Sequence, residues 1–218
     1  MNNTLKIDFV SDIACPWCAV GLAGLNTALG RLDAGTQVDL SFHPFELNPD
    51  MPAAGAVQLD YITNKYGMSA DQARANREQI RTRAAAVGFT MNRDDASRVY
   101  NTFDAHRLLT WARQEGVQAA LKAALLKAYF TDGKNIADRD VLIELAVQVG
   151  LDGDAASDIL ASGRYGQEVR DEELLWAQRG ISSVPAVVVN ERYLIPGGQP
   201  PHVYEEQLRA ILAGDGQA

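Results

Sequence analysis

The chain has 218 residues, of which 20 are basic and 28 are acidic, so its formal net charge is −8. That length suits one domain, or one domain that carries a large insertion. Hydrophobic residues make up 47% and charged residues 22%, a globular composition that excludes a disordered chain. The acidic balance argues against a nucleic-acid partner, whose binding face is usually basic.

Membrane and secretory signals are not apparent in the sequence. No apolar run approaches the roughly 18 residues that cross a bilayer, so no membrane partner is expected. A secretory signal needs a cationic start and an unbroken apolar core. Residues 1–10 contain one lysine, and Asp8 and Asp12 interrupt the apolar residues around them. The sequence therefore predicts a cytoplasmic protein.

The first 45 residues predict a strand, a helix and a second strand. Residues 5–10 alternate between apolar and polar side chains, which is typical of a strand. After Pro16 the apolar spacing becomes helical, and Gly30 is a suitable helix stop. Residues 37–45 alternate again. This is the pattern of a βαβ unit, for which a right-handed crossover is expected.

The middle of the chain, from about residue 58 to residue 178, predicts almost only helix. Ser69 and Gln72 form the sequence signature of a capping box at the start of a long helix. Glycines mark several of the ends, as helix C-termini favour. The predicted helices span residues 69–86, 99–115, 117–130, 137–149, 154–161 and 167–178.

Strand patterns return near the end of the chain, at residues 186–189 and 192–195, and a closing helix is predicted over residues 201–212. The sequence therefore predicts an α/β domain in two segments, residues 1–52 and 165–218. Residues 53–164 are predicted to form a helical insertion, which a surface loop accommodates at little loop-closure cost.

Cys15 and Cys18 are the only cysteines, and Pro16 and Trp17 separate them. The pair lies at the junction between the predicted strand and the predicted helix. Proline favours the first helical position, which places Cys15 at the N-cap. There its sulfur faces unpaired N–H groups and the positive end of the helix dipole, which favour the thiolate. Cys18 lies about one turn further on. The predicted chemistry is thiol–disulfide exchange, in which Cys15 attacks and Cys18 resolves the mixed disulfide.

Two other interpretations of the cysteine pair carry less weight. Half of a zinc site would need two more ligands, and His43, His106 and His202 show no paired spacing. No metal is therefore expected. An inert buried pair is disfavoured by the strand-to-helix placement and by the proline between the cysteines.

These features resemble the DsbA branch of the thioredoxin superfamily, and more closely its FrnE-like group of oxidoreductases. The resemblance extends over nearly the whole chain. It implies a thioredoxin fold interrupted by an all-helical insertion. The motifs that carry it are Ser11-Asp12-Ile13-Ala14-Cys15-Pro16-Trp17-Cys18, Asn101-Thr102-Phe103-Asp104-Ala105-His106-Arg107-Leu108, Gly180-Ile181-Ser182-Ser183-Val184-Pro185 and Tyr193-Leu194-Ile195-Pro196-Gly197-Gly198-Gln199-Pro200.

The resemblance also implies roles for residues outside the cysteine pair. Pro185 corresponds to a cis-proline that faces the cysteines, and the backbone of Val184 before it would pair with an extended substrate. Trp17 departs from periplasmic DsbA enzymes, which carry histidine there. An aromatic ring does not replace a cationic partner for the thiolate. A weaker resemblance extends to kappa-class glutathione transferases and 2-hydroxychromene-2-carboxylate isomerases.

Three further groups are open to a functional and a structural interpretation. Asp12 is a candidate to take the proton of Cys18, or a turn residue that binds its own backbone. His106 is a candidate for substrate contact on a helix over the site, or a packed core histidine. Arg74, Arg77 and Arg81 share one helix face, which indicates a solvated surface or an attraction for acidic partners.

The sequence thus predicts a thiol–disulfide oxidoreductase or disulfide isomerase that acts on protein or small-molecule thiols and disulfides. The cysteine pair is itself the redox group, so no cofactor is required, although glutathione is a candidate co-substrate. Two alternatives are a glutathione-dependent transferase or isomerase of the same fold, and a polypeptide-binding holdase. The oligomeric state is not predicted.

Overall fold

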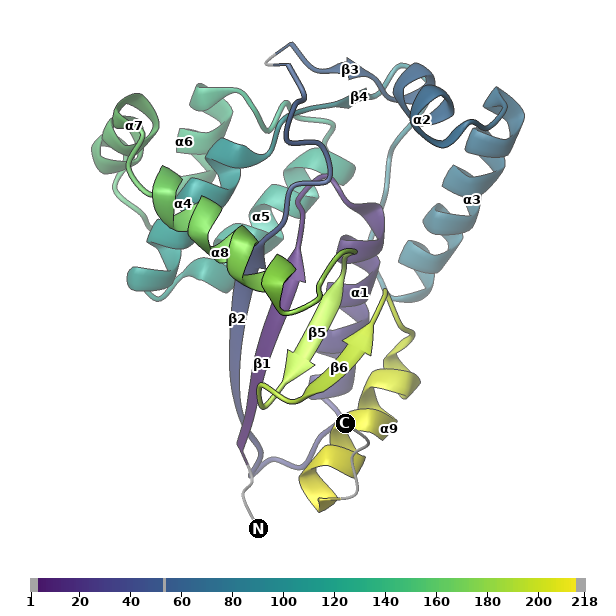
Figure 1. Ribbon diagram of the computed structural model, residues 1–218, viewed down its shortest axis with the longest axis vertical. Coiled ribbons are helices and arrows are strands. Elements are labelled where there is room, and N and C mark those ends of the chain that lie inside the picture. Colours follow the sequence, from purple (N-terminus) through teal and green to yellow (C-terminus); the bar gives the residue numbers. More distant parts are fainter. Residues whose placement is uncertain (1–3, 53, 215–218) are drawn as a thin grey trace.

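The computed structural model describes residues 4–52 and 54–214. Its main sheet has four strands in the order β2-β1-β5-β6. β1 (Thr4–Ser11) pairs in parallel with β2 (Gln37–Pro44), and antiparallel with β5 (Ala186–Val189). β6 (Tyr193–Pro196) closes the edge antiparallel to β5 (Figure 1). The predicted strands are therefore confirmed, and two segments far apart in the sequence share one sheet.

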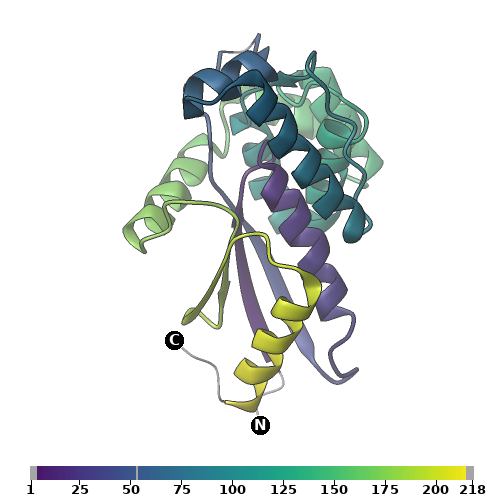
Figure 2. The same cartoon turned by 90° about the vertical axis from the view of Figure 1, so that its right-hand side faces the viewer.

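Helices cover both faces of this sheet. α1 (Pro16–Leu29) and α9 (Pro201–Ala213) contact each other on one face, and α8 (Gly166–Gln178) lies on the other (Figure 2). β1 is central, and Leu5, Ile7 and Phe9 on one of its faces are fully inaccessible to solvent. On the other face Asp8 and Val10 are buried and Lys6 is exposed. This arrangement is the thioredoxin fold that the resemblance implied.

In the described part of the chain, six further helices lie between β2 and α8. They are α2 (Gln58–Tyr66), α3 (Ala70–Ala86), α4 (Phe103–Gln114), α5 (Gln118–Phe130), α6 (Arg139–Gln148) and α7 (Gly153–Ser162). α1 begins at one end of the sheet. Figure 1 shows α2 and α3 on one side of that end, and α4 to α7 on the other side. The fold class is therefore α/β with a helical insertion. The predicted start of that insertion, residue 53, lies outside the described residues.

The structure corrects the predicted helix at residues 99–115. Val99 belongs to a short strand, β4 (Arg98–Val99), which pairs antiparallel with β3 (Ala56–Val57), and α4 begins only at Phe103. A two-residue ladder between distant segments leaves no periodic signal in the sequence. The predicted capping box is confirmed, because Ser69 Oγ accepts from the Gln72 N–H at 3.2 Å and Gln72 Oε1 accepts from the Ser69 N–H at 2.8 Å.

Within the described part of the chain, no helix has both the length and the apolar character needed to cross a membrane.

Candidate functional site

Cys15 is the N-cap residue of α1, as the sequence predicted. Its backbone is extended, with φ −87° and ψ 113°, and Pro16 occupies the first turn of the helix. The Cys15 carbonyl accepts from the N–H of Cys18 at 3.1 Å and from that of Ala19 at 3.4 Å. The first turn carries no acidic side chain. A sulfur at this position therefore lies at the positive end of the helix dipole, with no local carboxylate on the helix to oppose it.

Cys18 is the deeper of the two sulfurs. It is fully buried, whereas Cys15 retains 3% exposure, and both are free thiols. Burial raises the pKa of the Cys18 thiol well above its usual range, and the neighbouring Cys15 raises it further. Cys18 is therefore held as a protonated thiol behind Cys15.

The Val184–Pro185 peptide bond is cis, as predicted, and it faces the cysteine pair. The Cys15 thiol lies against the Val184 carbonyl, with Sγ and O 3.8 Å apart. The Pro185 carbonyl accepts from the Gly197 N–H at 2.9 Å. The loop after β6 therefore holds the proline loop in place against the start of α1.

Glycine is required where this loop meets α1. A Cβ atom on Gly198 would lie 2.8 Å from the carbonyl oxygen of Trp17, closer than packed atoms approach. A Cβ on Gly21, one turn into α1, would lie 3.2 Å from both Pro185 and Gly198. The sequence allows two interpretations of Gly197 and Gly198, a tight turn or a close backbone approach to the site, and Gly198 makes the close approach. It brings the backbone of the Cys-Pro-Trp-Cys segment against the loop after β6.

Asp12 is fully buried in the turn of residues 12–15 that joins β1 to α1 and carries Cys15, the candidate active-site turn. Its Oδ2 accepts from the Leu47 N–H at 2.8 Å, and its Oδ1 accepts from the Ala14 N–H at 3.3 Å. Burial by itself raises the pKa of the Asp12 carboxyl, but His106 and the Leu47 N–H together hold it below its usual range. Asp12 thus combines the predicted turn contact with an ionised carboxylate close to the cysteines.

His106 contacts Asp12 from α4 and does not line the cavity in front of Cys15. Its Nε2 lies 3.4 Å from Asp12 Oδ1, and the imidazole is 2% exposed. His43 is structural, with Nε2 2.9 Å from Asp8 Oδ1 and its ring 4.9 Å from that of Trp176. His202 is exposed. Of the three histidines, only His106 approaches the active-site turn.

Lys122 is a buried cation that was not predicted from the sequence. It lies on α5, is fully buried, and its Nζ has no hydrogen-bond partner among the described residues. Burial lowers the pKa of the Lys122 amine, while the nearby Cys18 and Asp12 act in the opposite direction. The feature of the sequence that could have indicated its burial is its position between Leu121 and Leu125, on the side of α5 that faces the core.

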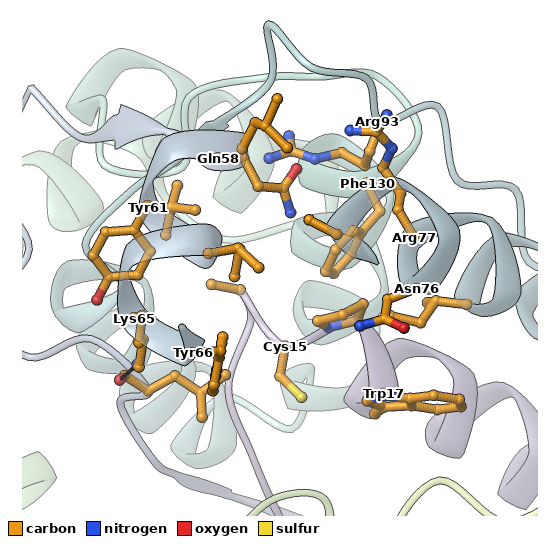
Figure 3. Close-up of a pocket in the computed structure, with 18 of the residues that line it drawn as sticks. Cys15, Trp17, Gln58, Tyr61, Lys65, Tyr66, Asn76, Arg77, Arg93 and Phe130 are labelled. Carbon is orange, nitrogen blue, oxygen red and sulfur yellow. Dashed lines mark hydrogen bonds between the residues drawn. The ribbon is translucent and has the colours of Figure 1, made fainter. Parts of the chain in front are cut away.

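A cavity of about 350 Å³ opens in front of Cys15. Figure 3 shows the Cys15 sulfur in it, with Trp17 on one side and Tyr66 and Lys65 on the other. Trp17 is 38% exposed at its rim. The remaining walls come mainly from α2, α3 and the segment that precedes α4, so the cavity lies between the thioredoxin fold and the inserted helices.

The predicted arginine face of α3 is largely neutralised. Arg74 Nε lies 2.9 Å and Arg77 2.6 Å from the carboxylate of Asp95, and Arg81 pairs with Glu78 at 2.8 Å. Arg77 and Arg81 also reach the cavity wall. The interpretation as a solvated, paired surface is therefore the one that fits Arg74.

The fold and the Cys-Pro-Trp-Cys pair at the start of α1 are those of a thioredoxin-like protein. Comparisons with known proteins identify the same class. The sequence model of the DSBA-like thioredoxin domain matches residues 6–209. The chain therefore belongs to the DSBA-like thioredoxin family.

Individual relatives agree with this assignment. A crystal structure of a probable DsbA oxidoreductase from Streptomyces coelicolor is 35% identical, with a TM-score of 0.91 over 98% of this chain and 92% of that one. The uncharacterized protein YwbO of Bacillus subtilis is 28% identical over 94% of this chain and 96% of its own. The cytosolic disulfide reductase DsbM of Pseudomonas aeruginosa, solved with glutathione, is 20% identical, with a TM-score of 0.65 over 95% of this chain and 99% of that one.

Proposed function

We propose that this protein is a thiol–disulfide oxidoreductase of the FrnE-like group, in which Cys15 attacks and Cys18 resolves. The observation that carries the proposal is the different placement of the two sulfurs. Cys15 lies at a helix N-terminus, on a cavity and beside the carbonyl that precedes a cis-proline, whereas Cys18 is buried one turn behind it.

The catalytic cycle follows from this geometry. The Cys15 thiolate attacks one sulfur of a substrate disulfide, and the other substrate sulfur leaves with the electron pair of the broken bond. Cys18 then loses its proton and attacks Cys15, which releases the second substrate thiol and leaves a Cys15–Cys18 disulfide. The substrate is reduced and the cysteine pair is oxidised. An external dithiol or two molecules of a monothiol restore the pair.

Glutathione is the proposed source of electrons. The support is the relative DsbM, which is described as a cytosolic disulfide reductase and was solved with glutathione. A reductase suits the cytoplasmic location that the sequence predicts, because the cytosolic glutathione pool is reducing. Metals and organic cofactors have no part in the proposed cycle.

The direct test is turnover of a protein disulfide. Wild-type protein should catalyse insulin reduction by dithiothreitol or glutathione, and Cys15→Ser should have no activity. Conjugation of glutathione to a simple electrophile should be weak in the wild type. Strong conjugation that survives Cys18→Ser, without insulin reduction, would contradict the proposal and favour the glutathione transferase alternative. Suppression of client aggregation by a double Cys→Ser variant would favour the holdase alternative.

A further inference from the structure

The cavity in front of Cys15 has two chemically different ends. Cys15 and Trp17 lie at one end, and Gln58 and Arg93 lie at the opposite end (Figure 3). Apolar side chains make up much of the remaining lining, and they include Ile62, Met68, Ile80, Met91 and Phe130. A molecule with its sulfur at Cys15 would therefore cross an apolar region before it reaches polar groups.

The polar end holds two buried atoms without partners. Neither Oε1 of Gln58 nor Nε of Arg93 has a hydrogen-bond partner in the part of the chain that the structure describes. Buried polar groups are nearly always satisfied, because each one that is not costs free energy. The two ends of the Gln58 amide exchange by rotation, so that group offers either an acceptor or a donor toward the cavity.

Arg93 is also a cation with no carboxylate partner among residues 4–52 and 54–214. Its terminal nitrogens donate to the Arg98 carbonyl at 2.6 Å, to the Tyr129 hydroxyl at 3.1 Å and to the Tyr129 carbonyl at 3.3 Å. Its guanidinium lies 4.2 Å from the centre of the Tyr129 ring. These partners are all neutral, so none of them supplies a negative charge to the guanidinium.

Among the described residues, the charged side chains that line the cavity are all positive, as Arg93 is. The described lining includes Lys65, Arg77, Arg81 and Arg93, and no aspartate or glutamate. Arg77 and Arg81 have carboxylate partners, and the Lys65 amine donates to the Leu47 carbonyl and to Asn48 Oδ1. In a chain with a net charge of −8, this cavity is a local site for an anion.

We propose that the cavity binds small disulfides that have an apolar, preferably aromatic, body and a carboxylate. The carboxylate lies beside the guanidinium of Arg93, where small rotations of the Arg93 and Gln58 side chains allow it to accept from the Nε–H and from the amide. The ring lies along the apolar walls. This places the disulfide at Cys15, whose thiolate forms the mixed disulfide while the other half of the substrate leaves as a thiolate with the bonding electron pair. The inference rests on the proposed function for this reaction, but not for binding.

The kinetic test compares two aromatic disulfides of similar size. 5,5′-Dithiobis(2-nitrobenzoate) carries a carboxylate on each ring, and 4,4′-dithiodipyridine carries none. We expect Arg93→Gln to lower the second-order rate constant of the reduced protein with the carboxylate disulfide by about tenfold, and to leave that with the neutral disulfide within about twofold. The matched control is Arg83→Gln, which removes the same charge from an exposed position on α3 outside the cavity.

Arg93→Gln loses contacts with Tyr129 and Arg98 and could therefore misfold. A second variant tests the same site without this loss. Gln58→Met removes an amide whose oxygen makes no hydrogen bond, and should lower the same rate constant by about threefold. Equal losses with both disulfides would show that these residues only maintain the active site, and would overturn the inference. Effects of Arg83→Gln as large as those of Arg93→Gln would also overturn it, because general charge attraction would then explain the preference.

Binding without redox chemistry separates this inference from the proposed function. Calorimetry with the Cys15→Ser variant should show that 1-naphthoate binds and that 1-naphthamide binds at least tenfold more weakly, with the difference lost in the additional Arg93→Gln variant. Binding of this kind in a protein that reduces no disulfide would support the site and refute the oxidoreductase. Active disulfide reduction with no preference for naphthoate would refute the site alone.

Discussion

Nε2 of His106 lies 3.4 Å from Oδ1 of Asp12, and both side chains are almost completely inaccessible to solvent. The contact joins the inserted helix α4 to the turn that carries Cys15. The Leu47 N–H, which donates to the other oxygen of the same carboxylate, joins the segment after β2 to this turn. One buried carboxylate therefore connects three segments around the cysteine pair.

Replacing His106 by leucine should raise the pKa of the Asp12 carboxyl and destabilise the fold. The depressed pKa of Asp12 contributes stability that is present above about pH 4 and is lost as pH falls through the folded-state value. Without His106, an incompletely compensated buried carboxylate remains, and we expect a loss of about 3 kcal/mol at pH 7. The loss should shrink between pH 7 and pH 5, because protonation then relieves the buried charge. Urea unfolding at several pH values measures it.

A double-mutant cycle isolates the contribution of this contact. In the Asp12→Asn background, the cost of His106→Leu should fall by at least about 1 kcal/mol, since the two residues interact directly. The exposed His202→Leu variant serves as the control and should match the wild type. Equal costs of His106→Leu in both backgrounds would mean that the histidine acts only through packing.

Replacing Lys122 by methionine should stabilise the protein at neutral pH. The folded-state pKa of this amine is depressed, so the folded state binds fewer protons than the unfolded state and stability rises with pH toward about 10.4. Lys122→Met removes this dependence. Its gain at pH 7 should be about 1.4 kcal/mol for each pH unit by which folding lowers the pKa of the amine, and smaller at pH 9.5. The exposed Lys127→Met on the same helix is the control. A gain independent of pH would show that the Lys122 pKa is not lowered in the folded protein.

The same substitution should slow the resolving step. The positive charge of Lys122 lowers the pKa of Cys18, so its loss raises that pKa further and moves the pH profile of mixed-disulfide release to higher pH. A Cys18 pKa that is higher by one lowers the thiolate fraction about tenfold at a fixed pH below that pKa. The more basic thiolate is also more nucleophilic, so we expect release to be about threefold to fourfold slower. Stopped-flow release of a bound chromophoric thiol over about pH 6–10, a range that brackets the free-thiol pKa, measures it. An unchanged profile would show that Lys122 does not influence Cys18.

Replacing Cys18 by serine should leave the attack by Cys15 intact and block resolution. Mixed disulfides between Cys15 and glutathione or client proteins should then accumulate, because only an external thiol releases them. Mass spectrometry and non-reducing gels detect the adducts. The matched Cys15→Ser variant should trap far less, since its remaining sulfur is fully buried. Greater trapping by Cys15→Ser would reverse the two roles.

Replacing Gly198 by alanine should impair activity more than stability. The added Cβ would lie 2.8 Å from the Trp17 carbonyl, so the loop after β6 or the start of α1 has to move. We expect a loss of at least tenfold in insulin reduction, with a change in unfolding free energy of about 1–3 kcal/mol, as for overpacking elsewhere. Gly153→Ala is a distant control, because its added Cβ would meet only methyl groups, at 3.0 Å on Val147 and 3.8 Å on Ile143. Full activity of Gly198→Ala would show that the close approach is not needed.

Local sequence patterns were sufficient for much of the fold. Alternating apolar residues located β1 and β2, a short apolar run located β5, and the Ser69–Gln72 capping box located the start of α3. The β3–β4 ladder escaped prediction because it has two residues in each strand and joins segments about 40 positions apart. Its stability comes from tertiary contacts, and local propensity does not report those.

By itself, the sequence determined the placement of Cys15 and Cys18, because a strand, a proline and a helical periodicity place one sulfur at a helix N-terminus by local geometry alone. Only the tertiary structure decided what surrounds them. Lys122 and His106 reach the active-site turn from α5 and α4, and Gln58 and Arg93 meet at one cavity although 35 positions separate them. What distinguishes them is their burial and the polar atoms that have no hydrogen-bond partner among the described residues. Both are properties of packing between distant segments, about which hydrophobic periodicity within one segment carries no information.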